Sequence, residues 1–193
     1  MKAEERGGAS LADLTKKALL EAFGKLIEEK PFNKITISDL TARCGLSRMT
    51  FYYHFNDIYG LMIWGLETQM LAVSRDCINY ENWKTGYLRV FQFGLERKAY
   101  IKKIFQTVEQ ENLEVYLNKI VERMVISVIE DKSGTRPINE EDKLFTAQLC
   151  SHVLVGTLVN WVSRGMKEQP EVIVKRVGCL LEGMIEKTIN GYE

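Results

Sequence analysis

Twelve consecutive residues gather the side chains of this sequence that are best suited to bind another molecule. They read CGLSRMTFYYHF and run from Cys44 to Phe55. If a helix begins after Ser47, its first turn presents Arg48 and Met49. A guanidinium can form two hydrogen bonds with the edge of a guanine, and an apolar side chain can contact a thymine methyl group. The pattern therefore favours contact with base edges in the major groove of DNA.

The same helix would carry a second, apolar face. Phe51 and Phe55 lie four residues apart, so they share one side and can pack on Leu40 and the first helix. Tyr52 and His54 fall outside that side, where a hydroxyl and an imidazole can bond to phosphate oxygens. The alternative is that these aromatic residues only build a core, since helical hairpins are common in proteins that never contact DNA.

Residues that could support catalysis are scarce. The two histidines, His54 and His152, have no metal-binding spacing such as H-x-x-x-H. A glycine-rich phosphate loop and a G-x-S-x-G motif are both missing from the sequence. His152 lies among apolar residues of a predicted helix, which fits a core or interface position better than a catalytic one. We expect no enzymatic activity, no catalytic residue, no cofactor and no metal site.

The elements that must position the twelve residues are helices. Apolar residues recur every three or four positions, and the chain has only three prolines. Ser10 can cap a first helix that ends before Pro31. Gly45 can end a second helix over 38–44, and Ser47 can cap a third that reaches about residue 55. Three helices with a tight glycine turn between the last two predict a helix-turn-helix unit.

Longer helices follow from Asp57 onward, and the predicted fold class is all-α. A helix that Asp57 caps should run to about residue 73, and the others are expected at 83–97, 99–107, 111–131, 139–164 and 170–189. The predicted organisation is a flexible tail over 1–9, a three-helix DNA-binding domain over 10–56 and a larger helical domain over 57–193.

The composition indicates the cellular compartment of the protein but does not identify its binding partner. With 26 basic and 26 acidic residues, total charge identifies no polyanionic partner. Cys44, Cys77, Cys150 and Cys179 are far apart in the sequence, which favours free thiols in a reducing compartment. The sequence shows no signal peptide and no run near the ~20 apolar residues that span a membrane. We expect a cytoplasmic protein that does not contact a membrane.

Residues 11–61 resemble the N-terminal domain of the TetR family of transcriptional regulators. The family pattern is roughly a hydrophobic residue, A-G-V-S-x-G-T-x-Y-x-H/Y-F and then K-x-K-x-x-L, and residues 44–61 read CGLSRMTFYYHFNDIYGL. The preceding FNKITISDL at 32–40 is similar to the family's lead into its second helix. The segment FYYHFNDIYGL is most similar to a branch that contains activators of dihydroxyacetone kinase operons.

The resemblance implies roles for individual side chains. Positions that contact the DNA backbone are matched by Thr36, Ser38, Thr50, Tyr52 and His54. Positions that approach base edges are matched by Arg48, Met49 and Tyr53. Ser47, which begins the helix that carries them, is also counted among the predicted DNA-binding residues. Met49 departs from the family, which often has glycine there. Ile58 stands where many members of the family have a lysine that neutralises a phosphate. Loss of that contact should reduce the slope of log K against log salt concentration by about one.

For the second domain, the resemblance implies a homodimer on a pseudo-palindromic operator. The helices expected at 139–164 and 170–189 carry wide apolar stripes that can pair across the dimer or pack within their own domain. The predicted interface residues are Leu154, Leu158, Trp161, Val177, Leu181 and Met184. Gly156, Gly178 and Gly183 interrupt these helices, and close approach of another backbone would compensate their low helix propensity.

A pocket for a small ligand is the second feature that the resemblance implies. The candidate lining residues are Trp64, Tyr87, Phe91, Phe93, Phe105 and Met124, although aromatic residues at helical spacing also build ordinary cores. The expected partners are double-stranded operator DNA, a second copy of the chain, and either a small-molecule effector or a protein partner. The competing interpretation is an interaction protein on the same fold with weak or conditional DNA binding, which Ile58 favours and Arg48 opposes. The operator, the effector and the choice between activator and repressor stay open.

Overall fold

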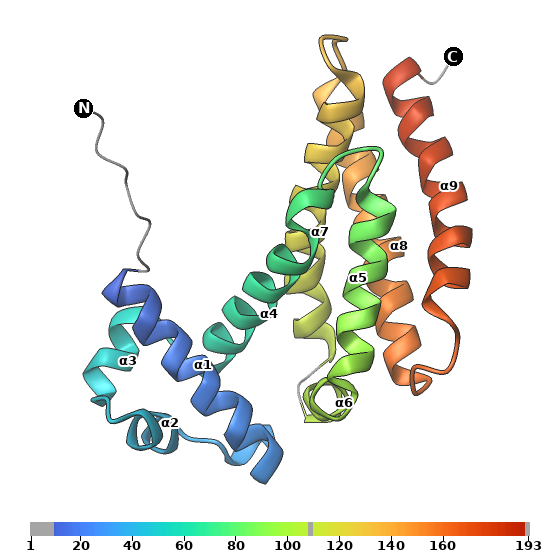
Figure 1. Cartoon of the computed structure of the whole chain (residues 1–193). Coiled ribbons are helices and arrows are strands. Elements are labelled where there is room, and N and C mark those ends of the chain that lie inside the picture. The colour runs from blue at the N-terminus through green and yellow to red at the C-terminus, as the bar shows by residue number, and fades with distance from the viewer. Residues whose placement is uncertain (1–9, 108–109, 192–193) are drawn as a thin grey trace, which may run out of the picture. The chain divides into compact units, whose positions relative to one another are not determined.

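The computed structural model describes residues 10–107 and 110–191, and in those ranges it consists of helices joined by loops and turns, with no strand (Figure 1). The all-α prediction is therefore confirmed for this part of the chain. The chain forms two compact units that divide between Leu66 and Glu67. This division falls inside a helix, whereas the predicted domain boundary lies at the start of that helix. The tail predicted over 1–9 lies outside the described residues.

The first unit contains the helix-turn-helix. Its elements are α1 (Leu11–Glu29), the 3₁₀ turn η1 (Phe32–Lys34), α2 (Ile37–Cys44), α3 (Arg48–His54) and the first part of α4 (Ile58–Ser74). The Ser10 side chain accepts a hydrogen bond from the backbone N–H of Asp13 at 3.1 Å, as a helix N-cap should. Gly45 ends α2 with a φ of 66°, a left-handed conformation that favours glycine. Asp57 accepts from the N–H of Gly60 at 2.7 Å and begins α4.

A compact apolar core holds these short helices together. It is formed by one face of each helix, and its members include Leu19, Phe23, Ile27, Leu40, Phe51, Leu61 and Met62, all at most 1% exposed. Leu11 and Leu14 share the apolar periodicity of α1 but are 82% and 54% exposed. The buried stripe of α1 begins only at Leu19.

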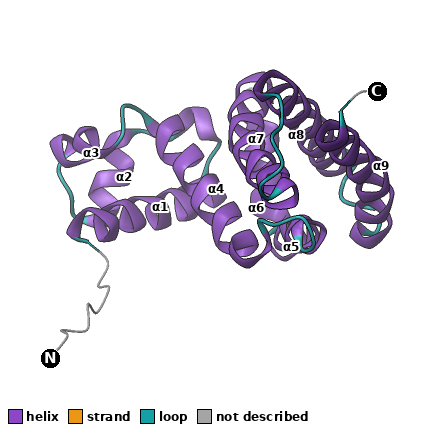
Figure 2. Cartoon of the chain, turned by 90° about the horizontal axis from the view of Figure 1, so that it is seen from above, coloured by secondary structure: helices purple, strands orange, loops and turns teal. Residues whose placement is uncertain are grey.

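The second unit is built from longer helices. They are the remainder of α4, the 3₁₀ turn η2 (Arg75–Cys77), α5 (Trp83–Glu96), α6 (Lys98–Thr107), α7 (Gln110–Ser133), α8 (Glu140–Ser163) and α9 (Pro170–Asn190). Figures 1 and 2 show α8 beside α7 and α9, and α5 also packs against α9. Asn139 caps α8 by accepting from the N–H groups of Glu141 and Asp142, and Pro170 occupies the first turn of α9.

Helix α8 is the one described helix whose length and composition would suffice to cross a membrane. Half of its apolar stretch is buried within the fold. Residues such as Ala147 and Cys150 are fully enclosed there. This burial is what a core helix of a globular domain shows.

Candidate functional site

Helix α3 is anchored by its aromatic face. Ser47 accepts a hydrogen bond from the N–H of Thr50 at 3.0 Å, and their hydroxyl oxygens lie 2.9 Å apart. Phe51 is fully buried and Phe55 is 8% exposed. The Phe55 ring packs against Trp64 with centroids 5.8 Å apart. The orientation of α3 is therefore set by both its N-cap and its buried rings.

The opposite face of α3 is open. Met49 and Tyr53 are 82% and 84% exposed, and Tyr52 is 51% exposed. Arg48 is exposed at the first position of the helix and has no ion-pair partner within the described residues. His54 is half-buried and meets the edge of the Tyr53 ring at 5.0 Å. The structure thus brings the predicted base-edge residues together on one exposed helix surface.

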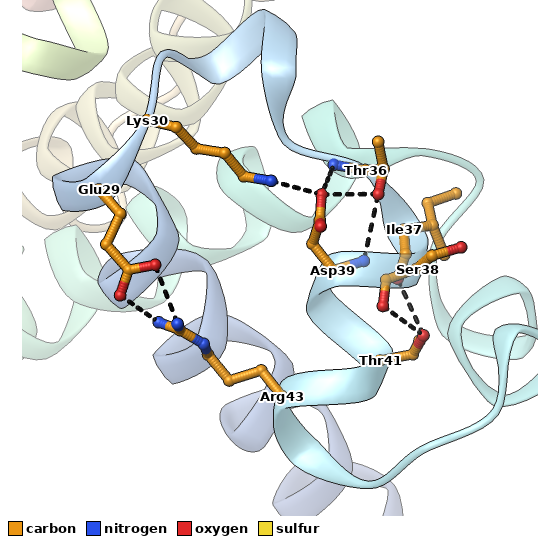
Figure 3. Close-up of polar contacts among 8 residues, drawn as sticks. All are labelled: Glu29, Lys30, Thr36, Ile37, Ser38, Asp39, Thr41 and Arg43. Atoms are coloured by element: carbon orange, nitrogen blue, oxygen red, sulfur yellow. Dashed lines mark hydrogen bonds and ion pairs between the residues drawn. The ribbon is translucent and has the colours of Figure 1, made fainter.

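The start of α2 is fixed by a capping box (Figure 3). The Asp39 carboxylate accepts from the Thr36 N–H at 2.7 Å and from the Thr36 hydroxyl at 2.6 Å. Thr36 in turn accepts from the Asp39 N–H at 3.1 Å. The Thr36 hydroxyl is therefore already engaged, while Ser38, the other residue predicted to contact the DNA backbone here, is exposed.

Two ion pairs tie α2 to the end of α1. Lys30 donates to Asp39 at 2.7 Å, and this bond, followed by those from Thr36, lowers the pKa of Asp39 to about 2. Arg43 donates to both carboxylate oxygens of Glu29, at 2.7 and 2.9 Å. Sequence reasoning missed these supporting residues. The Thr36-x-x-Asp39 spacing is the signal that could have revealed the capping box.

The comparisons with known proteins agree with this geometry. The model for bacterial regulatory proteins of the tetR family matches residues 19–63. A model described as a transcriptional regulator C-terminal region matches residues 81–183, more than half of the chain. The chain belongs to the TetR family. It is a DNA-binding transcriptional regulator with a helix-turn-helix domain, and not an enzyme.

Individual relatives refine the position within the TetR family. The HTH-type dhaKLM operon transcriptional activator DhaS of Lactococcus lactis subsp. lactis (strain IL1403) is 26% identical over 119 residues. That match covers 62% of this chain, and the chain spans only 63% of the length of that relative. It supports the resemblance to the branch of dihydroxyacetone kinase operon activators.

Solved structures show the same fold. A dihydroxyacetone kinase operon activator, DhaS, superposes with a TM-score of 0.65 at 22% identity, over 91% of this chain and 98% of that one. A TetR transcriptional regulator from Rhodococcus sp. RHA1 superposes with a TM-score of 0.61 at 20% identity, over 87% and 96%. At these identities the likeness is one of fold.

The second unit of this TetR regulator contains a partly open cavity of about 80 Å³ between α4, α5, α7, α8 and α9. Of the six predicted pocket residues, Tyr87 and Met124 line it. Phe91 instead packs in the core, 4.9 Å from the Tyr87 ring and 4.7 Å from Trp161. Phe93 lies against the guanidinium of Arg97.

The other two predicted pocket residues also lie outside the cavity wall. Trp64 packs on Phe55 in the first unit, and Phe105 is half-buried on α6. Aromatic content alone could not separate the wall of a cavity from the core around it.

The predicted dimer residues need a correction. Leu154, Trp161, Val177 and Leu181 are buried within their own chain, at most 8% exposed, and Leu158 and Met184 are half-buried. Trp161 donates from Nε1 to the carbonyl of Glu168 at 2.9 Å. The apolar periodicity correctly identified one face of α8 and α9, but that face packs inside the chain. Periodicity alone cannot tell whether an apolar face is covered by the same chain or by a second copy.

A different set of apolar residues on α8 and α9 is exposed, and this set is called the outward stripe. Its members are Leu144, Phe145, Leu149, Val153, Val172 and Leu180, which are 37% to 70% exposed. Gly156 and Gly183 are exposed on the same helices, and a Cβ added at either would meet nothing within 4 Å. By contrast, a Cβ at Gly178 would lie 2.7 Å from the Lys84 side chain, so its close approach is within the chain.

Proposed function

We propose that this regulator acts as a homodimer on a pseudo-palindromic operator, with α3 in the major groove. The observation that carries the proposal is the two-sided α3, with Phe51 fully buried and Met49 and Tyr53 more than 80% exposed. In a helix-turn-helix, the N-terminal residues of the second helix contact base edges. We assign Arg48, Met49 and Tyr53 to base edges.

The proposal also includes contacts to the DNA backbone from residues of α2 and α3. Thr50, Tyr52 and His54 are assigned to phosphate oxygens, with Ser38 at the start of α2. The hydroxyls of Ser47 and Thr36 cap their helices, so their proposed role is to fix the ends of α3 and α2 near the backbone. Free N–H groups at such helix ends favour phosphate.

The outward stripe of α8 and α9 supports the dimer. Monomers rarely expose several large apolar residues on one helical face, and a two-fold axis lets one patch cover its copy. A two-fold dimer presents two copies of α3, which matches two half-sites one DNA turn apart.

The proposal includes regulation of this dimer by a small molecule or a protein partner. It also includes a cytoplasmic location, the compartment that holds the DNA. The cavity in the second unit supports the small-molecule form. Similarity to an activator of the dhaKLM operon makes activation the direction to test first. The second candidate is a regulator that acts mainly through a protein partner, with conditional DNA binding; Ile58, in place of the family's usual lysine, favours it.

The test is selection of bound sequences from random DNA duplexes, performed at two salt concentrations. The full chain should enrich a pseudo-palindrome that the Tyr52→Phe/His54→Ala double variant loses. Arg48→Ala should cost about 1–3 kcal/mol of specific binding and relax one base position. Arg136→Ala, which removes another exposed arginine, is the matched control. Enrichment of no sequence by a folded dimer would contradict the proposal and favour the second candidate.

A further inference from the structure

Helix α3 carries few of the side chains that proteins use to distinguish bases by hydrogen bonds. Its sequence is RMTFYYH, which contains no Asn, Gln, Asp, Glu or Lys. In the major groove, adenine is normally recognised by the amide of Asn or Gln and cytosine by a carboxylate. Arg48 is exposed and has the geometry for guanine. No side chain of α3 can therefore make the usual two-bond contact with the adenine of an A·T pair.

Two large apolar side chains are exposed on this helix instead. Met49 is 82% exposed and Tyr53 is 84% exposed. They are four residues apart in the sequence, so they share one face of α3 and are separated by about 6 Å along the helix axis. Removal of apolar surface from water is favourable. This face is therefore suited to an apolar partner surface in the groove that α3 is proposed to enter.

The major groove offers one apolar group, the C5 methyl group of thymine. The other groups that the four bases present there are hydrogen-bond donors and acceptors. Successive base pairs are about 3.4 Å apart along the DNA axis. The separation of Met49 and Tyr53 thus corresponds to about two base-pair steps, so each side chain can contact the methyl group of a different base pair.

We propose that Met49 and Tyr53 form a methyl-contact pair, which recognises two thymines of each operator half-site through their C5 methyl groups. Arg48 binds a guanine beside them. Met49 stands where the TetR family often has glycine, which lacks the side chain for such a contact. This inference rests on the proposed function, since it names the class of DNA sequence that the exposed face of α3 recognises.

The test removes one methyl group at a time from the DNA. Selection from random duplexes with the full chain first gives the half-site. Each thymine of one half-site is then replaced by uracil, which also pairs with adenine but lacks the C5 methyl group. At two positions the wild-type protein should bind about fourfold more weakly, the effect of losing the burial of one methyl-sized group. The ratio should be equal at two salt concentrations, because no charge is changed.

Three variants assign the methyl groups to side chains. Met49→Ala should bind the thymine and uracil duplexes equally at one of the two positions and keep the wild-type ratio at the other. Tyr53→Ala should show the reverse pattern. Met49→Leu, which keeps an apolar side chain of similar size, is the matched control and should retain the preference for thymine. Both positions are exposed, so the variants should fold, which circular dichroism checks.

Methylated cytosine gives an independent measurement. Its methyl group is attached at C5, as in thymine, although it pairs with guanine. Replacement of the Met49-dependent thymine by cytosine should weaken binding, and 5-methylation of that cytosine should strengthen binding about fourfold. Met49→Ala should bind the methylated and unmethylated duplexes equally.

The outcomes separate this inference from the proposed function. Equal affinity of the wild-type protein for thymine and uracil at every position would overturn the methyl-contact pair. A half-site without thymine, or a uracil effect that persists at both positions in both alanine variants, would overturn it as well. Each of these results together with a selected palindrome leaves the proposed function standing. A folded chain that enriches no sequence contradicts both.

Discussion

Side chains at the start of α2 and α3 have two possible tasks, capping a helix and contacting DNA. The hydroxyls of Thr36 and Ser47 accept hydrogen bonds from backbone N–H groups three residues ahead. Arg48, Met49 and Tyr53 have exposed side chains and no capping role. Under the proposed function, discrimination between bases is therefore assigned to the second group. Loss of the first group should act on helix stability as well as on DNA binding, since an N-cap contributes about 1 kcal/mol.

Ile58 at the first position of α4 allows a direct test of the missing phosphate contact. Ile58→Lys should make operator binding tighter at low salt and raise the slope of log K against log salt by about 0.9, because one more phosphate is neutralised. The measurement is a titration with operator DNA at several salt concentrations. Ile58→Gln, polar but uncharged, is the control. Equal slopes for the two variants would show that position 58 does not reach a phosphate.

Asp39 should make the first unit sensitive to acid. Its pKa is lowered from 3.8 to about 2 in the folded state, mainly by Lys30 and then by Thr36. A carboxylate with a lowered pKa stabilises the fold above its unfolded pKa, and this contribution is lost as pH falls from about 4 towards 2. Asp39→Asn should flatten the pH dependence of thermal unfolding in that window, followed by circular dichroism.

Lys30→Ala is the matched variant for the acid effect. It removes the largest cause of the lowered pKa but leaves the capping box with Thr36 intact. Its unfolding curve should lie between those of the wild type and Asp39→Asn below pH 4. An Asp39→Asn protein with the same pH dependence as the wild type would contradict the assignment.

Helices of the second unit pack closely where small residues permit it. A Cβ built on Gly86 of α5 would lie 2.8 Å from the Cβ of Cys77, next to the cavity wall. Gly24, in the middle of α1, has no atom within 4 Å of such a Cβ. The two glycines have the same helical propensity cost but differ in the space around them.

The two glycine-to-alanine variants should therefore change stability in opposite directions. Gly24→Ala should raise the free energy of unfolding by about 0.5–1 kcal/mol, the propensity gain alone. Gly86→Ala should lower it by about 1–2 kcal/mol, because overpacking exceeds that gain. Urea denaturation of both variants checks the difference. Stabilisation by Gly86→Ala would show that α5 and η2 are less closely packed than in this structure.

Sequence predicted the helices well because helix ends depend on near neighbours. Ser10, Gly45, Ser47 and Asn139 each act within four residues of their own position, and the predicted helices from α5 onward begin and end within two residues of those in the structure. The surface that covers an apolar helix face could not be predicted in the same way. Trp161 was assigned to a dimer interface but is enclosed by its own chain, because periodicity carries no information on which surface it meets.

The cavity lay beyond sequence reasoning for a related reason. Its wall comes from five helices that are up to about a hundred residues apart along the chain. Only two of the six aromatic and sulphur-containing candidates line it. The exposed face of α3 was foreseeable, since both of its faces are encoded in seven consecutive residues.

At the scale of the whole molecule, the outward stripe of α8 and α9 predicts a second copy of the chain. Leu180→Glu places a charge at a leucine that is 70% exposed. It should shift the protein towards monomer and lower operator affinity at least tenfold, since each lost leucine burial costs about 1.5–3 kcal/mol and the dimer contains two. Sedimentation equilibrium and operator titration measure the two effects.

Val115→Glu on α7 is the control, because Val115 is 53% exposed outside the stripe. It should leave both the dimer and the operator affinity unchanged. A Leu180→Glu protein that stays dimeric would place the interface elsewhere on the molecule.

The apolar cavity also has a mechanical consequence. Internal space that water does not fill makes the folded state larger in volume than the unfolded state, and the part of this pocket of about 80 Å³ that stays dry adds to that space. Hydrostatic pressure favours the state of smaller volume, so compression should unfold the second unit more readily when its cavity is empty. A molecule that fills the pocket removes that dry space, and ligand occupancy would then be visible as resistance to pressure.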